Sequence, residues 1–400
     1  MLKAADSFPL VSIITPCYNH AAFLDTTIRS VLYQDYPHIE YIVVDGGSTD
    51  GCVDIIRHYQ DNLTAWVSEG DTGQADAINK GFRMAHGEII AWLNSDDYYF
   101  PYAVSTAVRR FQEDSDLTLF YGDGVLVTQH GNFQQYFCQV EPFDPDRLYA
   151  CSDYIMQPTT FFRRDKLFEA GLLDATLHYV MDWDLWCRLA KRGGRFHYEP
   201  HPIAVNRVYP GTKTSTGNWP RLVEIYQLIR RYKTSFWPHG MFSYLRTAMI
   251  EADLPGMLTQ SAAALLLLPG LYNTLHALRH RRPLYGMDWY IPALCAPAVT
   301  LYLPVLKPCQ HLLLDLQIPF SQGLQDQSVD IRINGVDALS HHFTTDTRPQ
   351  TITVPLTAGL CEAGYLRVDL SFSQAAPRRM LWHLYRQQDI ACVLQDVRLL

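Results

Sequence analysis

The 400-residue sequence predicts an α/β domain, then a helical connector, then a small all-β domain. Three observations predict this order. Short apolar runs alternate with amphipathic segments in the first half, two uncharged stretches follow, and strand-like alternation between turns fills the last part. The length itself indicates two or three domains, because single cores seldom exceed roughly 250–300 residues. We place the domains at 1–218, 219–308 and 309–400.

The first domain is expected to alternate strands with helices. The strands are predicted at 11–15, 41–44, 64–67 and 88–93, and the helices at 21–33, around 53–56 and at 76–85. This alternation favours a mainly parallel sheet covered on both faces, in which ligands collect at the carboxyl ends of the strands. The loops after Thr15, Val44 and Leu93 are therefore where a functional site is expected.

The later segments are less regular. A hairpin is predicted within 120–139, and a helix at 182–191 should turn Trp186 toward the core. The uncharged stretches 254–278 and 289–306 are interrupted by proline, so they favour a buried or membrane-interfacial region over a membrane-spanning helix. After residue 311, four strand-like runs are spaced as in a β-sandwich, and Asn334-Gly335 fits a tight hairpin turn.

Composition narrows the function classes. The net charge of -8 is a poor match for nucleic acid, which we exclude as a partner. The nine cysteines form no C-x-x-C pair, so free thiols in a reducing compartment are expected. The segment before Pro9 lacks the apolar core of a signal peptide. We therefore expect a cytoplasmic protein, with peripheral contact at the inner face of the membrane as a further expectation.

The sharpest local signal is Asn94-Ser95-Asp96-Asp97 at the end of an apolar strand. Two adjacent carboxylates repel each other, and a divalent cation would relieve that repulsion. Oxygen ligands suit Mg²⁺ or Mn²⁺, which usually share their remaining coordination with substrate phosphates. The alternative is a solvated turn that caps a helix.

An ordered series of motifs surrounds this signal. It runs Thr15-Pro16-Cys17-Tyr18-Asn19, Val43-Val44-Asp45-Gly46-Gly47-Ser48-Thr49-Asp50-Gly51, Asp71-Thr72-Gly73-Gln74, Ala77-Ile78-Asn79-Lys80-Gly81 and Leu93-Asn94-Ser95-Asp96-Asp97. In this order the motifs resemble family 2 glycosyltransferases of the GT-A fold, a Rossmann-like nucleotide-diphospho-sugar transferase fold. The resemblance spans about 11–213.

The resemblance implies a sugar nucleotide lying across the strand ends. It places Pro16 beside the donor, Tyr18 and Asp45 at the base, and Lys80 near the donor. Asp96 and Asp97 would face the ribose and the metal, with Asp97 the first choice as metal ligand. Structural alternatives remain: Asp45 as the cap of a turn, Tyr18 as a cover of the sheet edge, and Lys80 as a surface lysine.

A second signal is the segment Val180-Met181-Asp182-Trp183-Asp184-Leu185-Trp186. In the resembled family the acid at the head of this helix is the general base, which implies that Asp182 deprotonates the acceptor hydroxyl. Many members carry Glu before that acid, where this chain has Met181. Asp184 is expected to contact Arg188 at i+4. The alternative for Asp182 is a helix-dipole acid.

Four residues are expected on the acceptor or diphosphate side. Trp183 offers a ring face for stacking on an acceptor sugar, and Gln157 lies in a segment that resembles an acceptor-side segment of related sequences. Arg207 and Lys213 follow the predicted catalytic helix and would stabilise the leaving diphosphate. The alternatives are core packing, a proline bend and surface cations.

The C-terminal part, with Ala376-Pro377-Arg378-Arg379 followed by Asp389, is similar to an accessory β-domain beside some bacterial glycosyltransferases. Sugar binding, partner docking and a structural cap are all compatible with it. We predict no catalytic residue there.

Together these observations predict a metal-assisted, inverting transfer of one sugar from a nucleoside diphosphate sugar of the UDP, GDP or dTDP type. The acceptor would be a hydroxyl of a glycan or lipid-linked molecule, in bacterial surface polysaccharide synthesis by family analogy. One alternative is a nucleotidyltransferase, which would release pyrophosphate. The other is a catalytically inactive carbohydrate-binding or scaffold protein, which Met181 keeps open.

Overall fold

The chain divides into two compact units. The computed structural model describes residues 8–131, 133–137, 140–150, 152–213, 218–232, 293–295, 298–304, 310–317, 327–343, 350–356, 365–373, 376–377, 389–390 and 392–399. One unit comprises Met1–Gly124 and Gln139–Gly270, and the other comprises Val125–Cys138 and Leu271–Leu400. The hairpin predicted within 120–139 is confirmed, because the end of the strand Leu117–Val127 pairs antiparallel with the strand Phe133–Tyr136.

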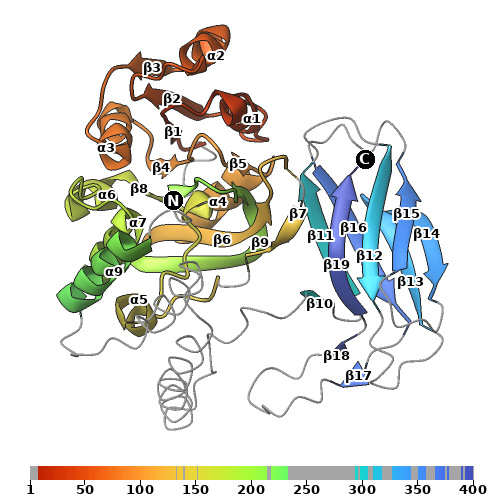
Figure 1. The fold of residues 1–400 in the computed structure, drawn as a ribbon. Coiled ribbons are helices and arrows are strands. Elements are labelled where there is room, and N and C mark those ends of the chain that lie inside the picture. The colour runs from red at the N-terminus through yellow and green to blue at the C-terminus, as the bar shows by residue number, and fades with distance from the viewer. Residues whose placement is uncertain are drawn as a thin grey trace, which may run out of the picture. The chain divides into compact units, whose positions relative to one another are not determined.

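The first unit is built on one twisted sheet (Figure 1). Its parallel part has the order β3-β2-β1-β4, formed by β1 (Val11–Cys17), β2 (Ile39–Asp45), β3 (Ala65–Ser68) and β4 (Ile89–Trp92). An antiparallel part continues it with β8 (Phe161–Arg163), β6 (Leu117–Val127), β9 (Arg195–Arg207) and β5 (Tyr98–Tyr99). The predicted α/β class is confirmed, whereas the antiparallel strands β5 and β9 had no counterpart in the prediction.

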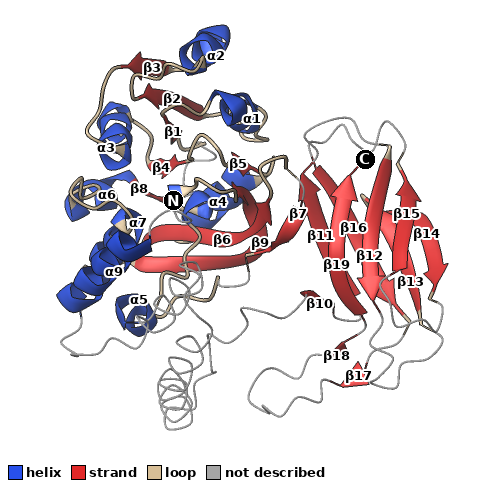
Figure 2. Ribbon diagram, viewed as in Figure 1, coloured by secondary structure: helices blue, strands red, loops and turns tan. Residues whose placement is uncertain are grey.

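Helices cover both faces of this sheet (Figure 2). They are α1 (Ala21–Leu32), α2 (Cys52–Tyr59), α3 (Gln74–Met84), α4 (Ala103–Glu113), α5 (Pro145–Ala150), α6 (Arg164–Ala170), α7 (Met181–Lys191) and α9 (Asn218–Tyr232), with short 3₁₀ turns η1 (Gln60–Asn62) and η2 (Gln157–Thr159). Because successive strand residues point to opposite faces, Ile13 packs into one core with α1, α2 and α4. Ile14 packs into the other core with α3, α6, α7 and α9.

Close packing sets how near α3 lies to the sheet. A Cβ at Gly81 would lie 2.4 Å from the Ile14 side chain, so only glycine lets the helix approach β1 this closely. On the same face, Trp92 of β4 stacks on Trp186 of α7 with ring centroids 5.5 Å apart. The prediction that Trp186 belongs to the core is confirmed.

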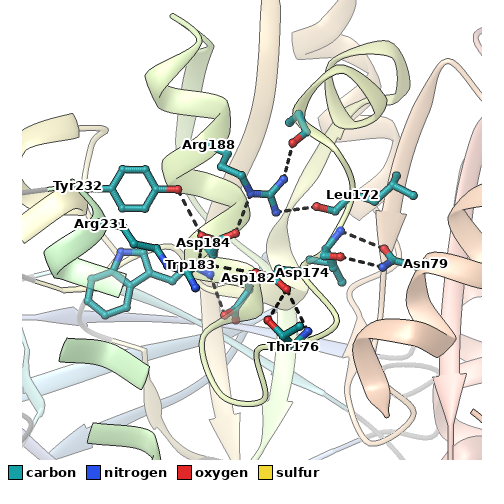
Figure 3. A network of polar contacts seen from close by, with 12 residues as sticks. Asn79, Leu172, Asp174, Thr176, Asp182, Trp183, Asp184, Arg188, Arg231 and Tyr232 are labelled. Atoms are coloured by element: carbon teal, nitrogen blue, oxygen red, sulfur yellow. Dashed lines mark hydrogen bonds and ion pairs between the residues drawn. The ribbon is translucent and has the colours of Figure 1, made fainter. Parts of the chain in front are cut away.

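A buried acid fastens α7 to its neighbours (Figure 3). Arg188 Nε donates to Asp184 Oδ2 at 2.7 Å, as the i+4 spacing predicted, and its two other guanidinium nitrogens donate to the carbonyls of Ala170 and Leu172 at 2.6 Å. Tyr232 of α9 donates its hydroxyl to Asp184 Oδ1 at 3.3 Å. The carboxylate thus joins α7, the end of α6 and the end of α9.

Helix α9 also holds the segment that leads into α7. Its Glu224 carboxylate accepts the backbone N–H groups of His178 and Tyr179, at 3.0 and 2.6 Å for the shorter contacts. The amide of Asn79 in α3 exchanges two hydrogen bonds with the backbone of Leu173 (Figure 3). The N-terminus of α7 is therefore fixed from two directions.

The second unit contains two four-stranded antiparallel sheets. One has the order β10-β19-β12-β15, from Ala293–Cys295, Cys392–Leu399, His311–Gln317 and Gln350–Pro355, and the other has the order β11-β16-β13-β14, from Ala298–Pro304, Tyr365–Phe372, Ser328–Ile333 and Val336–His342. Short strands β7 (Phe133–Tyr136), β17 (Ala376–Pro377) and β18 (Asp389–Ile390) complete it. Asn334 and Gly335 have φ values of 50° and 83°, which confirms the predicted hairpin turn.

The expected connector 219–308 is described only in part. It opens with almost the whole of α9, where a helical segment was predicted, but β10 and β11 are strands within the range expected to be helical. A proline-containing apolar run has no period that separates strand from helix, which explains the difference. The stretch 254–278 and the basic patch 279–282 lie outside the described residues. Among the residues that are described, no helix is long and apolar enough to cross a membrane.

Arg188→Met should lower the free energy of unfolding by about 3 kcal/mol, because it leaves the buried Asp184 carboxylate and two carbonyls with fewer donors. Equilibrium denaturation in urea measures the change. Lys166→Met, which removes an ion pair on the exposed side of α6, is the matched control and should change the stability by less than about 0.5 kcal/mol. Equal losses in the two variants would contradict a structural role for the Asp184 contacts.

Candidate functional site

The acidic loop, residues 94–97, follows β4 and contains two carboxylates in different surroundings. Asp97 is 1% exposed. Its Oδ1 accepts the Nδ2–H of Asn206 at 2.8 Å and the backbone N–H of Arg207 at 3.0 Å, while its Oδ2 accepts Asn94 Nδ2–H at 3.3 Å. Burial, and then the neighbouring charge of Asp96, raises the pKa of Asp97 well above its usual range. Both oxygens of Asp97 are therefore engaged within the protein.

Asp96 is less enclosed. Tyr209 donates its hydroxyl to Asp96 Oδ2 at 3.0 Å, and the backbone carbonyl of Asp96 accepts Arg207 Nε–H at 3.1 Å. Among the described residues, none donates a hydrogen bond to Oδ1 of Asp96. A cation that takes one or two carboxylate oxygens and completes its coordination with phosphate would fit this loop.

Arg207 lies behind the acidic loop. The side chain is buried, and its guanidinium carbon lies 4.8 Å from the ring centre of Phe23 and 5.6 Å from that of Tyr98. A cation between two rings and against a loop carbonyl stabilises the loop from within. The structure thus gives Arg207 a supporting contact to the acidic loop, on the side of the core.

Two further side chains hold the acidic loop from α1 and the segment before it. Thr27 donates its hydroxyl to the carbonyls of Ser95 and Asp97 at 2.8 and 2.7 Å. The imidazole of His20 hydrogen-bonds the hydroxyl of Ser95 at 2.8 Å. The loop is thus tied to both the parallel and the antiparallel parts of the sheet.

Asp45 ends β2 and is fully buried. Its Oδ2 accepts three donors, the backbone N–H groups of Gly47 at 3.2 Å and Ser48 at 3.0 Å and the hydroxyl of Ser68 at 2.6 Å. The turn-cap interpretation is therefore correct for this oxygen. Oδ1 is buried and has no hydrogen-bond partner. Because a buried acceptor without a donor is costly, Oδ1 marks a position where a ligand N–H would be stabilising.

Tyr18 and Gly46 lie next to each other, just after β1 and β2. Tyr18 follows β1 and is 62% exposed, so its ring is available to a ligand. A Cβ at Gly46 would lie 3.4 Å from the Tyr18 ring and 2.5 Å from Asp71 Oδ2, so a larger residue would crowd both side chains. Pro16 is buried within β1 opposite Val44, where it contributes to the strand.

Lys80 is engaged by the loop after β3. Its ammonium donates to the carbonyl of Gly70 at 3.0 Å and lies 3.1 Å from the Glu69 carboxylate and 4.0 Å from that of Asp76. These contacts give Lys80 a role in fastening this loop to α3.

Cys17, Asp45 and Cys52 bring a potential ligand atom each to within 4.8 Å of one another, the one group of this kind found among the described residues. The Cys17 thiol donates to Cys52 Sγ at 3.1 Å, and Cys52 Sγ also accepts the backbone N–H of His20 at 3.3 Å. Both are free cysteines, and their sulfur atoms are satisfied by these contacts. This group is separate in sequence from the acidic loop, where hard oxygen ligands suit Mg²⁺ or Mn²⁺ better than thiols do.

Asp182 lies in the first turn of α7, where its Oδ1 accepts the N–H of Trp183 at 2.8 Å. Burial raises the pKa of Asp182, although the charges of Lys213 and Arg221 oppose the shift. Asp153, which the sequence analysis did not single out, also has a raised pKa, first from burial and then from the charge of Asp182. Two carboxylates and two cations therefore interact at the head of α7.

Trp183 is turned into the core. It is 2% exposed, and its indole N–H donates to the carbonyl of Leu148 at 2.7 Å. This burial removes the ring face that stacking on a sugar requires, because α7 is buried around most of its circumference. Met181 is also buried in the core cluster.

Lys213 and Gln157 both connect to the acidic loop. Lys213 Nζ donates to Gln74 Oε1 at 3.0 Å, and Gln74 Nε2 donates to Asn94 Oδ1 at 2.8 Å. Asn94 Nδ2 donates to Gln157 Oε1 at 2.9 Å. Burial lowers the pKa of Lys213, and the charge of Asp182 opposes that shift. Lys213 therefore lies between the acidic loop and the head of α7.

The structure brings together the loops after β1, β2 and β4 at the carboxyl edge of the sheet, as the α/β pattern predicted. Sequence reasoning missed the contacts of Gln74, Asn206 and Tyr209 and the proximity of Asp153. Asn206 and Tyr209 are close to Arg207 in the sequence, and Gln74 belongs to the motif Asp71-Thr72-Gly73-Gln74. The sequence therefore offered a reason to consider all three. Asp153 lies in no motif.

Comparison with known proteins supports the resemblance to family 2 glycosyltransferases. Residues 12–171 match the model of glycosyl transferase family 2. An uncharacterized glycosyltransferase of Rickettsia typhi is 28% identical over 221 residues, covering 52% of this chain and 67% of its own length. A putative teichuronic acid biosynthesis glycosyltransferase of Bacillus subtilis, TuaG, is 44% identical over 92 residues, covering 22% of this chain. The match spans about a third of that relative's length, 36%.

Among solved structures, the mannosyltransferase PcManGT from Pyrobaculum calidifontis, in complex with GDP-Man and Mn²⁺, matches with a TM-score of 0.46. It is 20% identical, and the match covers 69% of this chain and 80% of that one. The family match and the strand order of the first unit agree with the predicted GT-A fold. Over residues 12–171, the chain is thus similar to glycosyl transferase family 2, as the sequence motifs indicated.

Proposed function

We propose that the chain transfers one sugar from a nucleoside diphosphate sugar to a hydroxyl of a glycan or lipid-linked acceptor, with inversion at the anomeric carbon. The observation that carries the proposal is the continuous contact between two acid sites. The acidic loop reaches Lys213 through Asn94 and Gln74, and Lys213 interacts in turn with Asp182. A metal at the donor diphosphate and a general base at the acceptor hydroxyl would therefore act at one reaction centre.

The donor base is proposed to lie between Tyr18 and Asp45. The unpartnered, buried Oδ1 of Asp45 needs an N–H donor. Uracil, thymine and guanine carry a ring N–H, whereas the corresponding ring nitrogens of adenine and cytosine are acceptors. This chemistry favours UDP, dTDP or GDP sugars, and the exposed Tyr18 ring offers a face for stacking on the base.

The diphosphate is proposed to lie at the acidic loop. Asp96 would hold Mg²⁺ or Mn²⁺, which neutralises charge on the leaving diphosphate when bound. We now place Asp96 ahead of Asp97 for this contact, because Asp97 already accepts three hydrogen bonds from the protein. Lys213 would add a second positive charge for the leaving group.

Asp182 is the proposed general base. As the acceptor oxygen attacks the anomeric carbon from the face opposite the diphosphate, Asp182 takes its proton, and a single displacement of this kind inverts the configuration. Met181 is in the core and carries no charge. Asp153 supplies a second carboxylate close to Asp182 instead, which favours a functional site over an inactive scaffold.

The biological setting is inferred from the relatives. The name of TuaG refers to teichuronic acid biosynthesis, which supports bacterial surface polysaccharide synthesis as the proposed setting. An activated donor of this kind is cytoplasmic, so we expect the chain to act there and to meet lipid-linked acceptors at the inner membrane face.

The first prediction concerns metal-dependent donor binding. In calorimetric titrations with UDP, GDP and dTDP, one nucleotide should bind the wild type more tightly with Mn²⁺ than without it. With Mn²⁺ present, Asp96→Ala should bind this nucleotide at least about tenfold more weakly than the wild type. The reason is that the variant lacks the open carboxylate oxygen that would hold the metal.

Two variants make this test specific. Asp61→Ala, an exposed acid in η1, should bind as the wild type does. Asp97→Ala should lower stability, because three donors lose their acceptor. If Asp97→Ala abolishes the effect of Mn²⁺ while Asp96→Ala retains it, the metal role returns to Asp97.

The second prediction concerns the base. Asp182→Asn should lower the transfer rate by about 10²–10⁴-fold while nucleotide affinity stays near the wild-type value, because an amide cannot accept the acceptor proton. Asp165→Asn, an exposed acid on α6, is the control. A transfer rate near wild type in Asp182→Asn would refute the assignment, and release of pyrophosphate would favour the nucleotidyltransferase alternative.

The third prediction concerns pH. Because burial raises the pKa of Asp182, the acid limb of the pH–rate profile should lie above the usual range of an aspartate. Lys213→Met removes a positive charge that favours the ionised form of Asp182, so the acid limb should move to higher pH. Initial rates across pH 4 to 8 measure the position of the limb, and an unchanged or downward-shifted limb would contradict the interaction between Lys213 and Asp182.

A further inference from the structure

Three amide side chains from separate elements form one hydrogen-bonded chain. Gln74 opens α3, Asn94 follows β4, and Gln157 lies in η2. Gln74 accepts from Lys213 at 3.0 Å and donates to Asn94 at 2.8 Å. Asn94 donates to Gln157 at 2.9 Å, and Gln157 Nε2 donates to the carbonyl of Trp92 at 2.9 Å. We call these three residues the amide chain.

The direction of the amide chain is set at both ends. The ammonium of Lys213 can only donate, and the carbonyl of Trp92 can only accept. Each amide must therefore present its oxygen toward Lys213 and its NH₂ group toward Trp92. Rotating one amide by 180° would bring two donors or two acceptors face to face. An aspartate at position 94 would face two acceptors, Gln157 Oε1 and Asp97 Oδ2.

The amide chain is also part of the acidic loop. Asn94 Nδ2 donates to Asp97 Oδ2 as well as to Gln157, so the loop carboxylate and the chain share one group. Lys213 has a second connection through the backbone, because it follows β9, whose last residues Asn206 and Arg207 both donate to Asp97. Two independent routes thus set the distance between the Lys213 ammonium and the acidic loop.

We propose that the amide chain is a positioning device that holds the Lys213 ammonium toward the diphosphate of the bound donor, at a fixed distance from the carboxylates of the acidic loop. Gln74 is its central member, since its amide contacts both Lys213 and Asn94. The inference rests on the proposed donor site and adds to it the residues that place its cation. Asn94 is required as an amide because it must donate in two directions.

Loss of Gln74 should weaken the binding of a nucleoside diphosphate more than that of its monophosphate. Without Gln74, the ammonium of Lys213 loses the acceptor that directs it toward the acidic loop, and the electrostatic contact to the leaving phosphate weakens. Binding of the base at Tyr18 and Asp45 is unaffected, because none of those residues contacts the amide chain in the described structure. The affinity ratio between a nucleoside diphosphate and its monophosphate is therefore the quantity that Gln74 controls.

The test compares this ratio in calorimetric titrations with Mn²⁺, using UDP, GDP and dTDP and the matching monophosphates. Gln74→Leu and Lys213→Met should each lower the ratio by roughly tenfold, as loss of one charge-assisted contact would. The double variant should be no lower than Lys213→Met alone, because Gln74 acts through Lys213. Gln74→Asn, which keeps the amide but shortens its reach, is a second variant should Gln74→Leu fold poorly.

Gln34→Leu is the matched control. Gln34, two residues after the end of α1, is also an amide with main-chain partners, Ser30, Phe100 and Val104, but these are not residues of the amide chain. Gln34→Leu should leave the affinity ratio between diphosphate and monophosphate unchanged, even if it lowers the stability of the protein. An unchanged ratio in Gln74→Leu, an equal loss for diphosphate and monophosphate, or additive losses in the double variant would each overturn the inference. If the wild type binds none of the three diphosphates, the proposed function fails first.

Discussion

The buried carboxylate of Asp97 is the constraint on which the arrangement of the site depends. A negative charge at the end of β4, 1% exposed and beside Asp96, is stable only if donors surround it. Asn206 and Arg207 supply two of them from β9, and Asn94 supplies the third. Satisfying this one group therefore brings an antiparallel strand from late in the chain against the loop of an early parallel strand.

Helix α7 shows how two acids of the same type acquire different roles. Asp184 is enclosed by Arg188, Arg231 and Tyr232 and serves to hold the helix (Figure 3). Asp182, two residues earlier, lies at the helix N-terminus among Lys213, Arg221 and Asp153. The rotation of about 200° between them on a helix sends one carboxylate into the core and the other toward the strand ends. Rigid attachment through Asp184 is what allows Asp182 to be placed accurately.

The two oxygens of Asp45, at the end of β2, have different surroundings. Oδ2 accepts three donors and shapes the turn after β2, while Oδ1 remains buried and without a partner. The cost of that unpaired oxygen is local, and a ligand N–H would remove it. Structural and functional interpretations of a site residue are therefore not exclusive, because a carboxylate has two acceptors to assign.

The sequence by itself determined the α/β class, the strand ends that carry the site, the turn at Asn334-Gly335 and the contact between Asp184 and Arg188, because each follows from a local period, turn chemistry or an i+4 spacing. Only the tertiary structure decided that Trp183 is buried, that Arg207 lies behind the acidic loop, and that Asp153 approaches Asp182. It also decided that Gln74, Asn94 and Gln157 meet. These contacts join residues 20 to more than 100 positions apart, and no local pattern encodes which distant donor will satisfy a buried charge.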